Sequence, residues 1–552
     1  MAPFSALKFA YAFTFVNLAW TTTATHSEGV SWSIGQTVHT SSGSVQGHAS
    51  KNAPSVSEYL GIPYAKPPVG NLRWAAPQNP NSPSANIKGS AFGYSCPSNG
   101  ATSFAAKLPG LFKQNLTGSA IQLLDSLIGQ TGDAFNEDCL TLNVWTKPQS
   151  GEKKKAVLLW IHGGSFNTGT SNIRAYNGYH LADTQDIIIV SINYRLNIFG
   201  FPGAPGITNN FGLLDQRLAI EWTRDNIHSF GGDPKRITLA GESAGAGSVD
   251  FYSFAWAKDP IVNGLILQSG IANPASSNAS VANWLVASTL LGCNSTSAAS
   301  SVLACMRSKD QDLLLKTITA LPTFGPAVDN VIVFSDNIAR ALAGNFIRKP
   351  MLIGHNDNEI GLFRILFLAL GQTLSDSSWT LQNLFPFNCG AALRAKTSSA
   401  KVTTWRYRYF GDFPNLALSK SPPSGAWHGA EIPMVFGTDL EVQNVTGRTA
   451  AQEQIGAYMQ GAWAAYVKDP EDGLKRYGWP KYDPKSKTLI RLGFENRTST
   501  NLASPADYDF SCPWIFTLGQ ALLNSASPQT AIDVLASLTR PVAQQVLALF
   551  EA

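Results

Sequence analysis

The pentapeptide Gly241-Glu242-Ser243-Ala244-Gly245 constrains the fold of this chain more than any other stretch. It follows the apolar run Arg236 to Ala240, which predicts a buried strand, and it precedes a helix-compatible run of small residues at 244–249. A glycine-flanked serine at a strand-to-helix junction is typical of a nucleophile elbow, a sharp turn that pushes the hydroxyl out above a sheet. The glycines are needed because a side chain there would collide with the neighbouring strand or helix. We therefore predict that Ser243 is a nucleophile and not an ordinary turn serine.

Apolar strands alternate with helices along much of the chain. The helical spacing of Leu213 to Thr223 predicts a helix. Continuous apolar runs, which indicate strands covered on both faces, occur at 156–161, 186–192, 265–268 and 350–353. This alternation predicts an α/β fold with a large, mainly parallel sheet covered by helices on both faces. The proline-dense stretch Leu60 to Pro68 is expected to be an extended path on the surface.

Length and charge limit the classes of function. A chain of 552 residues is compatible with one large α/β body, and we expect a single domain over residues 26–552. The net charge of +4 is too weak, and too evenly scattered, to suggest a nucleic acid or an anionic membrane as partner.

The amino terminus has the features of a secretory signal. Lys8 precedes the mostly apolar stretch Phe9 to Trp20, and small residues follow at 22–24. We expect a signal peptide over residues 1–25 and a secreted, extracellular protein. Six cysteines fit an oxidising compartment, and the absence of any C-x-x-C pair argues against a metal site. The N-x-[ST] sequons, which fit a glycoprotein, lie at Asn115, Asn278, Asn294, Asn444 and Asn496.

The segment between Cys96 and Cys139 has two interpretations. Apolar residues recur at helical spacing within Ser119 to Gly129. They predict either a surface helix packed on the core or part of a lid-like loop over a site. The residues themselves favour neither interpretation.

The loop His162-Gly163-Gly164-Ser165-Phe166 directly follows the apolar strand at 156–161. Two adjacent glycines let the backbone turn so that its N–H groups face a ligand. A hydrolase with a serine nucleophile needs such a loop as its oxyanion hole, at the end of a central strand.

The serine also needs a base and an orienting carboxylate. On the α/β-hydrolase fold the acid and then the histidine follow the serine in the chain. Only His355 and His428 follow Ser243, and we favour His428 because it lies in a glycine-flanked loop after the strand 403–410. For the acid, Asp357 and Glu359 follow the same strand, and this reasoning does not separate them.

These residues together resemble the type B carboxylesterase/lipase family, the α/β-hydrolases that include cholinesterases and fungal lipases with a glutamate triad. The resemblance rests on a series of motifs in order and spans about residues 35–515. The motifs are at 61–65, 137–143, 162–166, 230–234, 241–245, 358–359 and 428–429.

The resemblance implies a role for each site residue. Ser243 would be the nucleophile, Glu359 the acid and His428 the base. The oxyanion donors would be the backbone N–H groups of Gly164, Ser165 and Ala244, with Ser165 at a position where the family commonly has glycine or alanine. No cofactor and no metal ion is implied.

The resemblance also implies three disulfides, Cys96–Cys139 around the lid-like loop, Cys293–Cys305 and Cys389–Cys512. Arg73 and Glu137 occupy the positions of a buried ion pair in the family. The interval between Glu359 and His428 is shorter than in cholinesterases or the fungal lipases, so the helices that wall the acyl pocket are expected to be trimmed. Substrate specificity is therefore not carried over.

The predicted function is a secreted serine hydrolase acting on neutral carboxylic esters or lipids, with a small-molecule or lipid ester as partner and a transient contact with a lipid interface as an option. One alternative is a catalytically silent binding or adhesion module, against which the complete set of serine, glutamate and histidine argues. Another is a cholinesterase, which needs an aromatic platform for the quaternary ammonium. No tryptophan lies between Cys96 and Cys139, where that family's platform would be.

Overall fold

The computed structural model describes most of the chain from residue 32 to residue 514. The ranges outside the description are 1–31, 81, 99–114, 128–129, 131, 273–278, 294–296, 320, 322–323, 370–372, 444 and 515–552. The predicted signal peptide and the sequons at Asn278, Asn294 and Asn444 therefore lie outside the described residues. The side chains of Asn115 and Asn496 are exposed.

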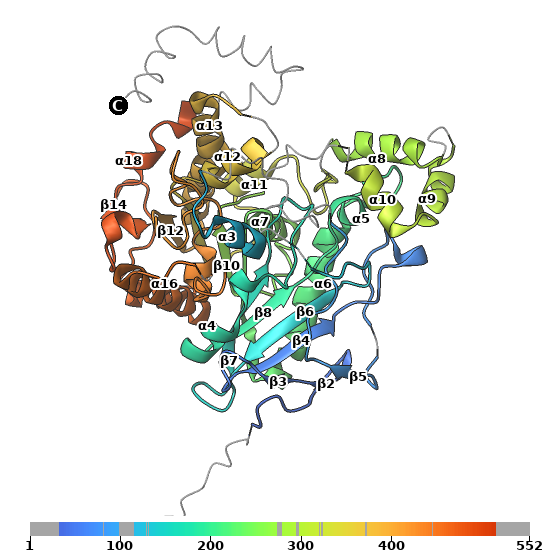
Figure 1. The fold of residues 1–552 in the computed structure, drawn as a ribbon, viewed down its shortest axis with the longest axis horizontal. Helices are drawn as coiled ribbons and strands as arrows, with labels where there is room; N and C mark the ends of the chain where they lie inside the picture. Colours follow the sequence, from blue (N-terminus) through green and yellow to red (C-terminus); the bar gives the residue numbers. More distant parts are fainter. Residues whose placement is uncertain are drawn as a thin grey trace, which may run out of the picture.

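An 11-stranded sheet forms the centre of the molecule (Figure 1). Its middle strands, from β13 to β8, pair in parallel, and antiparallel pairs close both edges. This confirms the predicted α/β fold. In spatial order the strands are β14 (Leu502–Ala503), β13 (Leu489–Leu492), β12 (Thr404–Tyr409), β11 (Met351–Asn356), β10 (Gly264–Gln268), β9 (Gly232–Glu242), β7 (Lys155–Ile161), β8 (Ile188–Ile192), β6 (Thr141–Thr146), β4 (Ser57–Pro63) and β3 (His48–Ala49). A small second sheet contains β1 (Val38–Thr40), β2 (Gly43–Gln46) and β5 (Asn86–Lys88).

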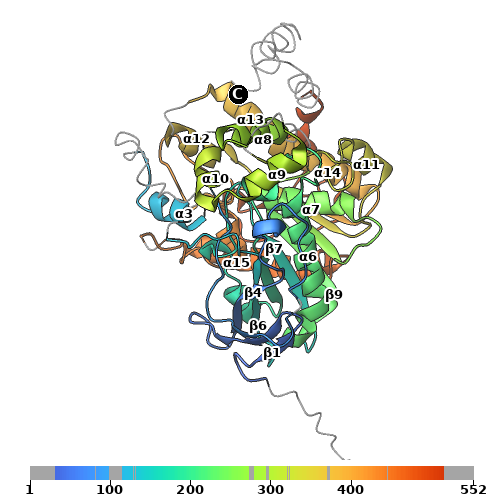
Figure 2. The ribbon, with the colours of Figure 1, turned by 90° about the vertical axis from the view of Figure 1, so that its right-hand side faces the viewer.

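Both faces of the sheet are buried, which explains why its central strands are continuously apolar. Along β7, Val157, Leu159 and Ile161 face one hydrophobic cluster, while Leu158 and Trp160 face the other. The first cluster is covered by helices that include α6 (Phe211–Asn226), α7 (Ala244–Ala255) and α14 (Gly390–Ser399), and Figure 2 shows α6 and α7 lying along the sheet. The second is covered by α4 (Tyr179–Thr184), α15 (Ile432–Phe436) and α16 (Ala450–Lys468).

The remaining helices lie mostly in the connections beyond the carboxyl ends of the strands. They are α3 (Ala120–Leu127), α5 (Asn197–Gly200), α8 (Ala279–Leu290), α9 (Ala299–Arg307), α10 (Gln311–Ile318), α11 (Asn337–Ala343), α12 (Ile360–Ala369), α13 (Asp376–Asn383), α17 (Gly473–Arg476) and α18 (Ala506–Asp509). Short 3₁₀ turns occur at η1 (Gly70–Leu72), η2 (Arg174–Tyr176), η3 (Ile227–Phe230) and η6 (Phe494–Asn496), and η5 (Leu384–Cys389) is a π-helix. None of the helices in the described ranges combines the length and apolar character needed to cross a bilayer.

The expectation of a surface path at Leu60 to Pro68 was wrong in its first half. Residues 57–63 form β4, an interior strand between β3 and β6, and Ile62 and Tyr64 are fully buried. Pro63 is tolerated because it is the last residue of the strand, where a missing N–H costs the sheet little.

Three disulfides connect the cysteines of the described chain, in the pairing that the family resemblance implies: Cys96–Cys139, Cys293–Cys305 and Cys389–Cys512. Helix α3, between Cys96 and Cys139, buries Ala120, Leu123 and Leu124 against the second hydrophobic cluster. Nearby, the buried side chain of Arg73 donates from Nε to Glu137 Oε2 at 2.7 Å.

Candidate active site

Ser243 lies at the turn between β9 and α7, with φ 56° and ψ −122°. This left-handed backbone is costly for a residue with a side chain, and it persists only where the surroundings enforce it. The surroundings here are very close: a Cβ on Gly241 would overlap the carbonyl group of Gly245, and a Cβ on Gly245 would overlap the carbonyl oxygen of Ile161 at the end of β7. The two glycines therefore let the turn pack against β7 while the serine points away from it.

The loop after β7 lies against this turn. A Cβ on Gly163 would be 3.0 Å from the Cβ of Ser243. Gly164 and Ser165 both have positive φ, 105° and 54°, which bends the loop back on itself. Within the described chain no hydrogen bond is formed by the N–H groups of Gly164, Ser165 or Ala244. Ala244 is the first residue of the 12-residue helix α7, where the helix dipole favours negative charge. These three donors are thus available to a developing oxyanion.

Glu359 and His428 are paired at the same edge of the sheet. Glu359 follows β11, is fully buried, and its Oε2 lies 2.6 Å from His428 Nδ1. The competing carboxylate, Asp357, points elsewhere and accepts a hydrogen bond from Arg408 Nε at 2.8 Å. His355, the other histidine after Ser243, is buried within β11, and burial lowers its pKa well below the usual value. Of the residues that the sequence left open, the structure pairs Glu359 with His428.

The second ring nitrogen of His428 faces Glu242. Its Nε2 lies 3.2 Å from Glu242 Oε1, and no hydrogen bond joins these two described residues or connects Nε2 to Ser243. Burial alone would lower the pKa of His428, but the Glu242 and Glu359 carboxylates outweigh it and raise the pKa to about 9. Burial raises the pKa of Glu242 to about 8. The two groups lie 3.2 Å apart and each affects the charge of the other, so they titrate as a coupled pair.

A network behind the pair contains residues to which sequence reasoning assigned no role. The backbone N–H of Asn356 donates to Glu359 Oε1 at 2.6 Å, and its side chain donates to Glu431 Oε2 at 2.5 Å. Gln268 Nε2 donates to Glu431 Oε1 at 3.0 Å. Asn356 thus connects Glu359 to Glu431 and Gln268. In the sequence, the one signal that could have pointed to this network was Glu431, a carboxylate three residues after His428.

Two phenyl rings contact the imidazole of His428. The ring centroids of Phe363 and Phe387 each lie 5.0 Å from that of His428, and 6.0 Å from each other. Phe363 comes from α12 and Phe387 from the π-helix η5, a helix type that often occurs at functional sites. In the same helix α12, Leu362 and Ile365 are buried in the core.

Several known proteins that this chain resembles in sequence and in fold are named as esterases or lipases. The model of the carboxylesterase family matches residues 35–385. A chlorogenic acid esterase from Aspergillus niger is 34% identical over 487 residues, covering 83% of this chain and 90% of the relative. The chain belongs to the carboxylesterase family.

Other carboxylesterase relatives agree. "Secreted lipase 5" from Gibberella zeae is also 34% identical, over 506 residues, covering 83% of this chain and 90% of that protein. Among solved structures, a PNB esterase aligns with a TM-score of 0.70 and 26% identity, covering 87% of this chain and 99% of its own. The protein is therefore a carboxylic-ester hydrolase. Within its described residues no cluster of three or more His, Cys, Asp or Glu side chains could hold a metal ion.

The Glu242–His428 pair predicts the pH dependence of this carboxylesterase. A base must be neutral to accept a proton, so if His428 is the base, the acidic limb of kcat/KM follows its pKa. Glu242→Gln removes a carboxylate that raises this pKa. We expect the midpoint of the acidic limb to fall by about one pH unit or more. The measurement is a pH profile of kcat/KM with a neutral ester, with Glu152→Gln at the exposed Arg236 pair as control. An unchanged or higher midpoint in Glu242→Gln would contradict the assignment.

The contact between Phe363 and His428 predicts a second effect. Phe363→Ala removes the ring that packs on the imidazole, so the base samples unproductive orientations. We expect kcat to fall between about 10-fold and 10²-fold. The control is Phe367→Ala, one turn further along α12, where the ring packs on Trp379 instead. Similar losses of kcat in both variants, at equal thermal stability, would show that the effect is not specific to His428.

Proposed function

We propose that this carboxylesterase is a secreted serine esterase that hydrolyses neutral carboxylic esters through an acyl-enzyme, with Ser243 as nucleophile, His428 as base and Glu359 as acid. The observation that carries the proposal is the arrangement at one edge of the sheet. The strained serine turn, three available N–H groups and the buried Glu359–His428 pair at 2.6 Å lie beyond the carboxyl ends of β9, β7, β11 and β12, all in the parallel part of the sheet.

The first half of the reaction forms the acyl-enzyme. His428 Nε2 takes the proton of the Ser243 hydroxyl as its oxygen attacks the ester carbonyl carbon. The negative charge on the former carbonyl oxygen is stabilised by the N–H groups of Gly164, Ser165 and Ala244. His428 then gives its proton to the leaving alkoxide. Hydrogen bonds to a catalytic base are often long without substrate and tighten in the complex, which fits an Nε2 that faces Glu242 here.

The second half releases the acid. Water attacks the acyl carbon while His428 Nε2 accepts its proton, and the proton then returns to the Ser243 oxygen. Throughout, Glu359 stabilises the imidazolium and holds its Nδ1–H. The neutral character of the proposed substrates is supported by the rings of Phe363 and Phe387 beside His428, since apolar walls favour uncharged acyl groups. The amino-terminal signal pattern and the three disulfides support secretion.

The test is a chain-length series of p-nitrophenyl and glycerol esters, measured below and above substrate solubility. Smooth saturation on short and medium acyl chains is expected for an esterase, and a rate increase at the solubility limit would indicate a lipase acting at interfaces. A choline ester hydrolysed faster than the neutral ester of the same shape would contradict the preference for neutral substrates.

A further inference from the structure

A polar groove lies beside α3, formed by two adjoining pockets of about 490 and 940 Å³. The pockets share Asp133, Asn172, Arg174 and Glu441, so they form one continuous depression, here called the Arg174 groove. Ser243, Glu359 and His428 line neither pocket. The walls come from five separate chain segments: residues 51–52, residues 92–94, residues 122–134 between Cys96 and Cys139, residues 170–177 after β7, and residues 441–443.

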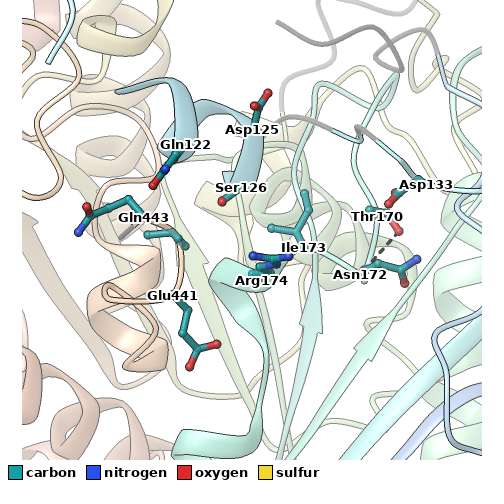
Figure 3. A pocket seen from close by; sticks show the side chains of 11 residues that line it. Gln122, Asp125, Ser126, Asp133, Thr170, Asn172, Ile173, Arg174, Glu441 and Gln443 are labelled. Atoms are coloured by element: carbon teal, nitrogen blue, oxygen red, sulfur yellow. Dashed lines mark hydrogen bonds between the residues drawn. The ribbon is translucent and has the colours of Figure 1, made fainter. Parts of the chain in front are cut away.

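Arg174 lies in the middle of this groove, between Gln122 and Ser126 of α3 on one side and Asp133 and Asn172 on the other (Figure 3). Its side chain is exposed. With the other described residues its guanidinium forms no hydrogen bond and no ion pair within 4 Å, and it attracts the Glu441 carboxylate only from a longer distance. Five N–H donors in a planar fork are therefore free for a ligand. A surface arginine usually extends into solvent, but this one stands between the walls of a pocket.

Three carboxylates line the groove, those of Asp125, Asp133 and Glu441. Asp125 Oδ1 is buried without a hydrogen-bond partner. Asp133 accepts hydrogen bonds from Ser95, at 2.5 Å to Oδ2, and from Gln130, and Glu441 accepts one from Asn52. Burial raises the pKa of all three groups. The groove thus holds one acceptor without a partner, Asp125 Oδ1, beside the donors of Arg174.

The balance of charge favours a neutral ligand. Lys51 and Arg174 are opposed by Asp125, Asp133 and Glu441, so neither an anion nor a cation meets a field of one sign. A hydroxyl group donates and accepts at the same oxygen, so neighbouring hydroxyls can accept from Arg174 while donating to a carboxylate. This is the hydrogen-bonding pattern of a polyol.

The wider pocket also has aromatic rings. Phe92 and Tyr94 line it, and Tyr94 is 47% exposed although its ring is largely apolar. An exposed ring with a polar tip provides a flat contact surface at low conformational cost. Sugar rings present apolar C–H faces between their hydroxyl groups, which such a surface can cover.

We propose that the Arg174 groove is a second binding site, separate from the esterase site, that takes a neutral saccharide through hydrogen bonds to Arg174 and the surrounding carboxylates and stacking on Tyr94. The site binds and does not catalyse. It therefore stands independently of the serine mechanism proposed above.

The experiment measures binding of cello- and xylo-oligosaccharides to the full chain by calorimetry and ligand-observed NMR. Saturable binding at one site is expected, with a Kd of about 1 mM or tighter. Arg174→Ala and Tyr94→Ala should each weaken binding about tenfold or more. The control is Arg497→Ala, an exposed arginine outside the groove, which should bind as the parent does. Hydrolysis of p-nitrophenyl acetate should be unchanged in all variants, because none of these residues lines the esterase site.

Three results would overturn the proposal. The first is that neither neutral oligosaccharide binds saturably at concentrations up to about 10 mM, ten times the expected Kd. The second is binding that Arg174→Ala leaves intact. The third is tighter binding of an anionic oligogalacturonide or a cationic chitosan oligomer, which would assign the groove to a charged ligand. Since Arg174 is exposed and forms no hydrogen bond or ion pair within 4 Å with the described residues, thermal unfolding of Arg174→Ala should match the parent and exclude misfolding as the cause.

Discussion

Replacing Ser243 with alanine is expected to lower kcat by about 10⁶-fold and to abolish acylation. In the proposed mechanism the Ser243 hydroxyl oxygen attacks the ester, and this variant removes it from the turn at φ 56°. The loss is measured as the disappearance of the p-nitrophenol burst in stopped flow and of labelling by a fluorophosphonate probe. Folding should be retained, because alanine fits the same turn with a smaller side chain.

Ser269 offers a matched control. It follows β10, the strand next to β9, has the same φ of 56° and is buried. Ser269→Ala should keep both the burst and the label, because that hydroxyl lies outside the reach of a substrate. A burst of normal size in Ser243→Ala would end the assignment of the nucleophile. Failure of the parent protein itself to react with the probe would point to a silent binding module.

Replacing Glu359 with glutamine is expected to lower kcat by about 10⁴-fold. The carboxylate accepts the Nδ1–H of His428 at 2.6 Å, which keeps the other nitrogen free to act as a base and stabilises the imidazolium. A glutamine amide has the same shape but no charge, and it can present a donor to Nδ1 and so favour the wrong tautomer. Steady-state kinetics give the loss, and thermal unfolding shows whether this buried site still folds.

Asp357→Asn is the control for this experiment, because Asp357 and Glu359 follow the same strand and both were candidates for the acid. Its carboxylate pairs with Arg408 and does not contact His428. We expect kcat to change less than about tenfold, with a modest loss of stability from a partly exposed ion pair. A larger loss in Asp357→Asn than in Glu359→Gln would reverse the roles of the two acids.

Several features could be predicted from the sequence because their signals are local. The elbow is one, since strand, glycines, serine and helix are consecutive and each is needed for the turn. The central strands are another: burial on both faces demands continuous apolar residues, and 156–161 and 265–268 correspond to β7 and β10. The order of residues in the chain left only two histidines as candidates for the base.

Other features depend on contacts between distant segments. Residues 57–63 lie inside the sheet because β6 supplies their partner strand. The prolines nearby had instead favoured a surface path, so the sequence did not indicate this pairing. The π-helix at 384–389 and the position of its Phe387 against His428 have no sequence pattern that separates them from an ordinary helix. Arg174 lines a groove only because the fold brings α3 and Glu441 next to it, and Glu441 is far away in the sequence.

The sequence by itself determined the fold class, the serine turn and the short list of its partners, because strand burial, glycine conformation and chain order act within a few residues. Reasoning from the residues themselves left the acid open between Asp357 and Glu359, and only the tertiary structure decided which of the two carboxylates contacts His428. Asp357 and Glu359 are two positions apart after one strand, yet one side chain points to Arg408 and the other to His428. That choice is made by packing against residues about 50 to 70 positions further along the chain, whose placement no local pattern encodes.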